Sequence, residues 1–296
     1  MNRQYKDKLF KFIFGNPDHK EWTLSLYNAI NNTNYDNPQD IILTTIENVI
    51  YMGMKNDVSF LLDETLSFYE QQSTYNPNMP IRYLIYIGMS YSGYIENNDV
   101  SLFTSKTQKL PTPKCICFYN GPEDEPDNIT LKLSDSFEHM DADVEVTVHM
   151  ININNGRNKN LLDACKPLRE YAIFIDKTRA YQLQGKSFED AVGMSIDALP
   201  ADSVLKSFLL SNKAEVTNMC ITEYNAERQM ELLRREEQRY GREEGRVEGR
   251  AEGRTEGRLS LLFEDVRDGI RTPEQAAIKA GMSLEDFNKA YMDYKV

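Results

Sequence analysis

The chain has 296 residues, of which 41% are hydrophobic, and this is enough for one sizeable α/β core with an appendage. It has no run of about 18 apolar residues, and its first residues lack a signal-peptide pattern. We therefore expect a cytoplasmic protein without a membrane partner. The net charge of −12 counts against a nucleic-acid partner, because neutralisation of phosphates dominates that affinity. A local basic strip can nevertheless coexist with an acidic whole.

The cysteines give no sign of a metal or disulfide framework. The four of them, at positions 115, 117, 165 and 220, include no Cys-X-X-Cys pair. Cys115 and Cys117 fall on one face of a predicted buried strand, which is a common place for cysteines outside disulfides. Neither structural zinc nor a disulfide network is expected.

Residues 55–72 predict a β-hairpin whose turn follows Asp63. Apolar residues alternate with others on both sides of that turn. The turn places Asp57 opposite Glu70, and Gln72 lies on the same face as Glu70. Like charges opposed in this way destabilise a strand pair. A divalent cation between the two carboxylates would reverse that cost.

Two plainer interpretations of the hairpin stay open at this point. Charged residues on strands usually form a solvated face. In addition, a register shifted by one residue would put Asp57 and Glu70 on opposite faces of the sheet.

The segments around the hairpin read as regular elements. Helices are predicted over 3–14 and 18–31, and a strand over 41–54 leads into the hairpin. Pro80 then opens an apolar helix that ends near Glu96, and we expect its Arg82 to face away from the packed stripe.

Two short segments carry basic residues that a phosphate backbone would attract. The loop that holds Lys106, Lys109 and Lys114 beside prolines is the best basic loop in the chain. A glycine-containing turn further on leads to Arg157 and Lys159. Charged loops and surface turns are usually only solvated, so contact with DNA phosphates is one of two interpretations for each.

The rest of the first two thirds predicts strands and then helices. Buried strands are expected over 114–120 and 144–153, joined by an acidic loop, and helices near 160–184, 187–199 and 201–211. This order of elements indicates an α/β fold, a mixed sheet flanked by helices with a helical C-terminal extension.

Several phrases of the sequence resemble one nuclease family. Asp57 followed by Glu70-Gln71-Gln72 is similar to the Asp…Glu-X-Lys core of the PD-(D/E)XK nucleases, with Gln in the Lys position. The surrounding phrases resemble the recombination-promoting nuclease (Rpn) and transposase branch of that superfamily. They are YKDKLFKFIFGN, ENVIYMGMKNDVSF, EQQSTYNPNMPIRYLIY, CFYNG and ININNGRNKNLLDAC. The resemblance spans residues 1–185 and continues into the Gly-Arg-X-Glu tail.

The resemblance implies a Mg²⁺- or Mn²⁺-dependent DNA endonuclease. Asp57 and Glu70 would hold the metal, which lowers the pKa of bound water and stabilises developing charge. Gln72 cannot act as a base or supply positive charge, so it would orient the attacking water. Asp7 matches an acidic position of the family's opening phrase, and Glu47 could reach the site. Their ordinary interpretations are a charge at a helix N-terminus and a solvated strand residue.

Two rival functions stay open beside the endonuclease. The first is a catalytically inactive nuclease-like domain that binds nucleic acid or protein. The second is a protein whose function rests on self-association through its tail.

The tail from Gly241 to Arg258 repeats Gly-Arg-X-Glu every four residues. Each glycine costs a helix roughly 1 kcal/mol relative to alanine, or about 5 kcal/mol for all of them. Arg and Glu of the repeat cannot form the usual intrahelical pairs, because they are not spaced three or four residues apart. The repeat is therefore either a flexible linker or an interface in which the Arg and Glu stripes of two chains meet. The strong helix former just before it favours the interface.

The last residues predict two short helices around a glycine turn. Thr272 caps the first helix, Pro273 takes its first position, and Gln275 completes a capping box. Gly281 ends that helix and Ser283 caps the next. The outline is similar to a helix-turn-helix. The second helix begins with acidic residues, which favours a packing or partner-binding module over a DNA reader.

These observations predict four segments. They are a nuclease-like core over 1–185, a helical extension over 186–226, a charged helix with the repeat over 227–258, and the helical pair over 259–296. The expected partners are DNA and, through residues 227–258, a second copy of the chain.

Overall fold

The computed structural model describes residues 9–44, 57–139 and 141–294. The chain forms two compact units, residues 1–227 and 228–296. Among the described residues, no helix is both long and apolar enough to cross a membrane.

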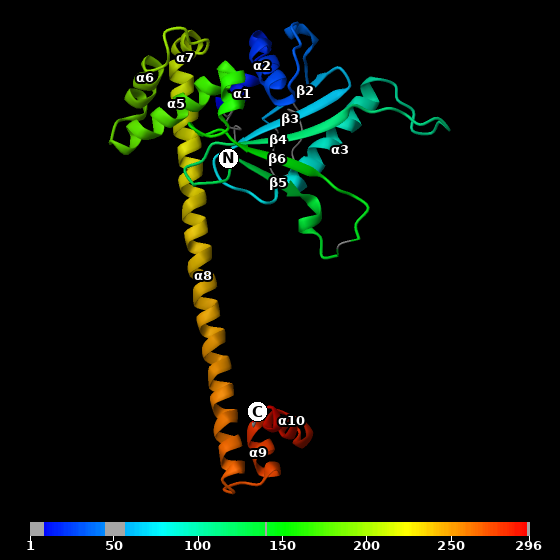
Figure 1. Cartoon of the computed structure of the whole chain (residues 1–296), viewed down its shortest axis with the longest axis vertical. Helices are drawn as coiled ribbons and strands as arrows, with labels where there is room; N and C mark the ends of the chain where they lie inside the picture. The colour runs from blue at the N-terminus through cyan, green and yellow to red at the C-terminus, as the bar shows by residue number, and fades with distance from the viewer. Residues whose placement is uncertain (1–8, 45–56, 140, 295–296) are drawn as a thin grey trace, which may run out of the picture. The chain divides into compact units, whose positions relative to one another are not determined.

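A six-stranded mixed sheet in the order β1-β2-β3-β4-β6-β5 organises the first unit (Figure 1). The first three strands are antiparallel, β3, β4 and β6 are parallel, and β5 is antiparallel to β6. The prediction of an α/β fold with a mixed sheet is confirmed. The strands are β1 (Ile42–Leu43), β2 (Val58–Leu62), β3 (Thr65–Gln72), β4 (Thr112–Tyr119), β5 (Asn128–Lys132) and β6 (Thr147–Asn152).

The β2–β3 hairpin has the predicted register. Val58 pairs with Tyr69 and Leu62 with Thr65. Asp63 makes the turn with a positive φ of 50°, a conformation that Asp tolerates better than most residues. The alternation of apolar residues and the turn chemistry are thus consistent with each other, which is why the sequence specifies this register.

Helices cover both faces of the sheet (Figure 1). Helix α3 packs on one face, where Tyr83 donates its hydroxyl proton to the Ile116 carbonyl over 2.6 Å. Helices α1, α2 and α5 pack on the other face. The helices of this unit are α1 (Leu9–Phe14), α2 (Lys20–Asn31), α3 (Met79–Asn97), α4 (Lys159–Ala164), α5 (Lys166–Leu183), α6 (Phe188–Asp197) and α7 (Lys206–Ser211). Short 3-10 turns lie at η1 (Pro17–His19), η2 (Pro38–Asp40) and η3 (Leu133–Ser136).

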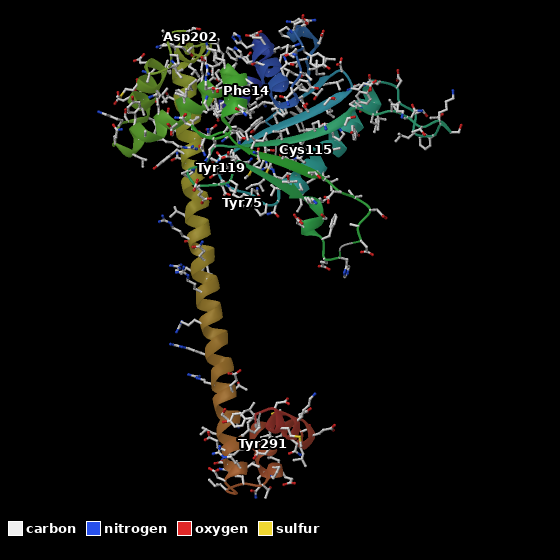
Figure 2. All side chains as sticks on the ribbon, viewed as in Figure 1. Phe14, Tyr75, Cys115, Tyr119, Asp202 and Tyr291 are labelled. Carbon is white, nitrogen blue, oxygen red and sulfur yellow. The ribbon has the colours of Figure 1, made fainter. Side chains whose placement is uncertain are left out.

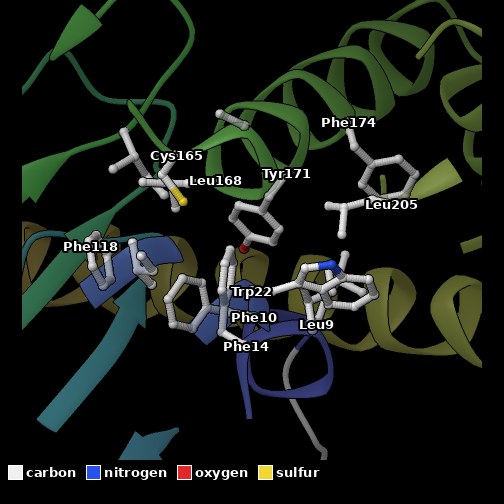
Figure 3. Packing of buried hydrophobic residues seen from close by; sticks show 14 of the residues in the cluster. Leu9, Phe10, Phe14, Trp22, Phe118, Cys165, Leu168, Tyr171, Phe174 and Leu205 are labelled. Carbon is white, nitrogen blue, oxygen red and sulfur yellow. The ribbon is translucent and has the colours of Figure 1, made fainter. Parts of the chain in front are cut away.

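An aromatic cluster forms the larger core, between the sheet and α1, α2 and α5 (Figure 3). The ring centroid of Phe10 lies 5.2 Å from that of Phe118 on β4 and 5.7 Å from that of Tyr171 on α5. The predicted extension after residue 185 joins the same core, because Val192 of α6 and Leu209 of α7 are buried in it.

The opposite core lies under α3. Cys115 and Cys117 both point into it from β4, as predicted, and all four cysteines of the chain are buried. Figure 2 shows Cys115 and Tyr119 on that strand.

Three boundaries differ from the sequence prediction. Strand β5 lies in the connection between the two predicted buried strands, just after the predicted acidic loop. Ile129 and Leu131 alternate with polar residues there, but two apolar residues in so short a stretch are a weak strand signal. The helix predicted over 160–184 breaks at Cys165, because Pro167 starts a new helix. Of the strand predicted over 41–54, residues 45–54 lie outside the described part of the chain.

Helix α8 (Lys213–Arg267) begins in the first unit and continues through the second. In the first unit, Val216 and Met219 are buried, and Glu223 Oε1 accepts a hydrogen bond from the Leu9 amide over 2.9 Å. The Gly-Arg-X-Glu repeat is helical throughout, so a flexible linker does not describe its conformation. Every described side chain between Leu232 and Arg258 is exposed (Figure 2).

A small apolar cluster forms the core of the second unit. Helices α9 (Pro273–Ala280) and α10 (Leu284–Tyr294) pack against the end of α8 through Phe263, Ala277 and Phe287. The predicted capping box at Thr272 is present, and Gly281 ends α9 with φ 76°. The Ser283 hydroxyl accepts a hydrogen bond from the Asp286 amide, as expected of an N-cap.

Candidate functional site

The hairpin brings Asp57, Glu70 and Gln72 to one end of β3. Asp57 directly precedes the Val58–Tyr69 pair, so the register places it opposite Glu70. Its Oδ2 accepts a hydrogen bond from the backbone amide of Gln71 over 2.8 Å. Gln72 Nε2 donates to Glu70 Oε1 over 2.8 Å, which confirms that these two side chains share a face.

Both carboxylates are buried. Asp57 is 5% exposed and Glu70 is fully buried, so the interpretation of this hairpin as a solvated charged face is wrong. A buried carboxylate needs a compensating charge or hydrogen bonds, because burial otherwise disfavours its ionised form.

Arg82 of α3 supplies a compensating charge. Its Nη2 pairs with Glu70 Oε1, and its side chain is only 19% exposed. Nε and Nη2 also donate to the Tyr86 hydroxyl, over 3.3 and 3.0 Å. The expectation that Arg82 faces away from the packed stripe is therefore wrong.

Helical spacing contained the signal for Arg82. Met79, Tyr83 and Tyr86 are among the buried residues of α3, and Arg82 lies three residues after Met79 and four before Tyr86. That spacing puts Arg82 on the buried face. A cation on that face needs an acidic partner on an element that packs against α3.

The pKa shifts of Arg82 and Tyr86 follow from their contact with Glu70. Burial lowers the pKa of Arg82, but the charge of Glu70, with smaller contributions from Tyr86 and Asp57, reverses the shift and raises it. Burial raises the pKa of the Tyr86 phenol, and the charge of Glu70 raises it further. Arg82 therefore stays charged and Tyr86 stays protonated at neutral pH.

The site lies toward the end of the sheet where the parallel strands finish. Open α/β sheets commonly bind ligands at this edge. At this edge, the backbone amide of Asn120 donates a hydrogen bond to the backbone carbonyl of Gln72 over 3.0 Å. Arg179 of α5 holds Asn120 by two hydrogen bonds, 2.7 Å to its side-chain oxygen and 2.6 Å to its carbonyl.

The predicted basic residues divide into two groups. Lys106 and Lys109 are exposed in the loop between α3 and β4, and Lys114 is exposed early on β4. This strand passes Glu70 only at Cys117, so the three lysines lie toward the opposite end of the sheet. Arg157 and Lys159, after β6, already have acidic neighbours. Arg157 pairs with Asp124 and Asp127, and Lys159 with Asp163.

The donor set fits a small hard cation. Asp7 and Glu47 lie outside the described residues. Within the described ranges, no group of three or more His, Cys, Asp or Glu side chains is arranged to hold a metal ion. Two carboxylates are nevertheless sufficient for Mg²⁺, which is usually bound through one or two of them together with waters and phosphates.

Comparisons with known proteins add no assignment. No protein-family model, no curated protein and no solved structure matches this chain.

Proposed function

We propose that this chain is a metal-dependent DNA endonuclease with a PD-(D/E)XK-like core. The observation that supports this most is the buried pair of opposed carboxylates, Asp57 and Glu70, at the end of a central hairpin. Burying two acidic groups side by side costs stability. A divalent cation bound between the two carboxylates would offset this repulsion and would attract a phosphate to the site.

Asp57 and Glu70 are the residues that would hold Mg²⁺ or Mn²⁺. When bound, the metal lowers the pKa of water and stabilises charge on the phosphate. The Gln71 amide fixes the Asp57 carboxylate, and Gln72 fixes that of Glu70, so both are oriented in advance.

Gln72 has a second role in this proposal. Its Nε2 is engaged by Glu70, which leaves Oε1 as the amide atom that accepts a hydrogen bond from an attacking water. The side chain cannot supply positive charge. In this site Arg82 brings the cationic group, from a helix instead of the strand.

One observation favours a second candidate, an inactive nuclease-like domain that binds nucleic acid or protein and oligomerises through its tail. Glu70 already has two cationic or polar partners, Arg82 and Gln72, as expected of a structural ion pair. In that case the site stabilises the fold and binds no metal.

Cleavage of supercoiled plasmid by the full chain separates the two candidates. We expect nicking with Mg²⁺ or Mn²⁺, and its loss with EDTA. Retarded migration of intact plasmid with either metal, without nicking, would favour the binding domain and reject the endonuclease.

A further inference from the structure

Arg82 and a divalent cation would compete for the same carboxylate, that of Glu70. Glu70 Oε1 accepts hydrogen bonds from both Arg82 Nη2 and Gln72 Nε2. A carboxylate oxygen has two lone-pair directions, so these two donors fill Oε1. A positive charge on Oε1 would also repel a cation that approaches the same carboxylate.

Arg82 has a second anchor besides Glu70. Its guanidinium also donates to the Tyr86 hydroxyl, one turn along α3, through Nε and through Nη2, the nitrogen that pairs with Glu70. In the Glu70–Arg82 ion pair, the Arg82 side chain is the more exposed, at 19% against 0% for Glu70. The fork of N–H donors on a guanidinium also matches the oxygens of a phosphate.

We propose that Arg82 is a positioning residue that exchanges with the divalent cation on Glu70. Arg82 holds the buried carboxylate in place, would yield this carboxylate to a bound cation, and would then turn its guanidinium, still anchored by Tyr86, to a phosphate oxygen of the DNA. This role of Arg82 rests on the proposed function and gives the site the positive charge that Gln72 lacks. One substitution of Arg82 should therefore raise the affinity for the metal and lower the affinity for DNA.

Calorimetry with Mn²⁺ alone, on the full chain, measures the first effect. We expect Arg82→Gln to bind Mn²⁺ at least about tenfold tighter than wild type, because the competing charge is gone. The same variant should bind a short duplex more weakly in Ca²⁺. Arg179→Gln is the matched control, since it removes a nearby guanidinium that bonds to Asn120 and not to a carboxylate. It should leave Mn²⁺ affinity unchanged.

Chemical modification tests the exchange without a variant. Phenylglyoxal should modify Arg82 of the wild-type chain faster once Mn²⁺ is added, while Arg179, followed in the same digest by mass spectrometry, keeps its rate. Mn²⁺ affinity that is unchanged or weaker in a folded Arg82→Gln overturns the exchange, as does an unchanged rate at Arg82. If the wild type cuts plasmid while either result is negative, only the exchange fails. A wild type that binds no Mn²⁺ overturns the endonuclease as well.

Discussion

The Glu70–Arg82 pair determines how substitutions at the site affect stability. With the sequence alone, removal of one of two opposed carboxylates is expected to relieve repulsion. The structure changes that expectation, because the Glu70 charge is offset by Arg82. The pKa of Arg82 is higher in the folded chain than in the unfolded one. The stabilisation that its ion pair with Glu70 gives is therefore complete below the unfolded pKa and is lost only as the pH rises through the higher folded pKa. It is therefore constant near neutral pH.

Arg82→Met should lower the free energy of unfolding by about 3 kcal/mol, because the Glu70 charge stays buried without the cation that offsets it. Adding Glu70→Gln should restore most of the loss. Urea denaturation of the two single variants and the double variant measures the coupling. Additive losses in the double variant would show that the two side chains do not stabilise each other.

Gln72→Ala should slow cleavage by roughly 10- to 1000-fold, as expected for loss of one positioned hydrogen-bonding group. Metal affinity should change little, since Gln72 orients Glu70 and water and is not a ligand. Isothermal titration with Mn²⁺ gives the affinity. If metal binding disappears with Gln72, the role assigned to it is wrong.

Local patterns predicted Asp57, Glu70 and Gln72, and tertiary packing decided the rest of the site. Alternation and the turn were enough to oppose the two acids. Helical spacing places Arg82 on the buried face of α3. Which acidic residue it meets depends on how α3 lies against β3, and local patterns do not specify that.

At the scale of elements, the elements best predicted are those with strong periodicity or clear caps. The hairpin, α2 and α9 follow their patterns. Strand β5 was not predicted, because two alternating apolar residues, Ile129 and Leu131, are a weak signal in a short edge strand that is paired only with β6.

The loop between α3 and β4 provides a prediction at the same scale. Its lysines lie toward the end of β4 that is remote from Glu70, so they should affect DNA affinity and not the rate of cleavage of bound DNA. We expect Lys106→Glu with Lys109→Glu to weaken duplex binding about tenfold or more and to reduce the salt dependence by about two ions. Fluorescence anisotropy over a range of salt concentrations measures both.

Lys186→Glu is the control, because Lys186 is also an exposed lysine and lies in a different loop. Because the control carries one charge reversal and the double variant two, a loss of binding free energy about half as large in the control would mean that net charge alone matters. Unchanged affinity in the double variant would leave the loop as a solvated segment.

At the scale of the whole molecule, residues 227–258 differ from the rest in charge. They contain nine Arg and nine Glu within a chain of net charge −12. An added Cβ at any of the five repeat glycines of α8 would meet no atom within 4 Å, so nothing in the described chain requires glycine there. Close approach of a second helix, with Arg stripes facing Glu stripes, would explain both features.

We therefore expect the full chain to be a dimer or larger, and truncation after Glu227 to give a folded monomer. The truncation keeps the part of α8 that packs in the first unit, including Glu223 and its bond to Leu9. Association should weaken with salt, which screens charges over about 8–10 Å. Light scattering at low and high salt tests this. A full chain that is monomeric at low salt would exclude the interface.

The central claim is that Asp57 and Glu70 form one metal-binding catalytic site. Plasmid nicking in Mg²⁺ by wild type, Asp57→Asn, Glu70→Gln and the control Asp163→Asn tests it most directly, because Asp163 is a surface carboxylate in an exposed ion pair. Nicking should be abolished in both site variants and unchanged in the control, with all four proteins folded by circular dichroism. Cleavage at the wild-type rate by either site variant would contradict the claim.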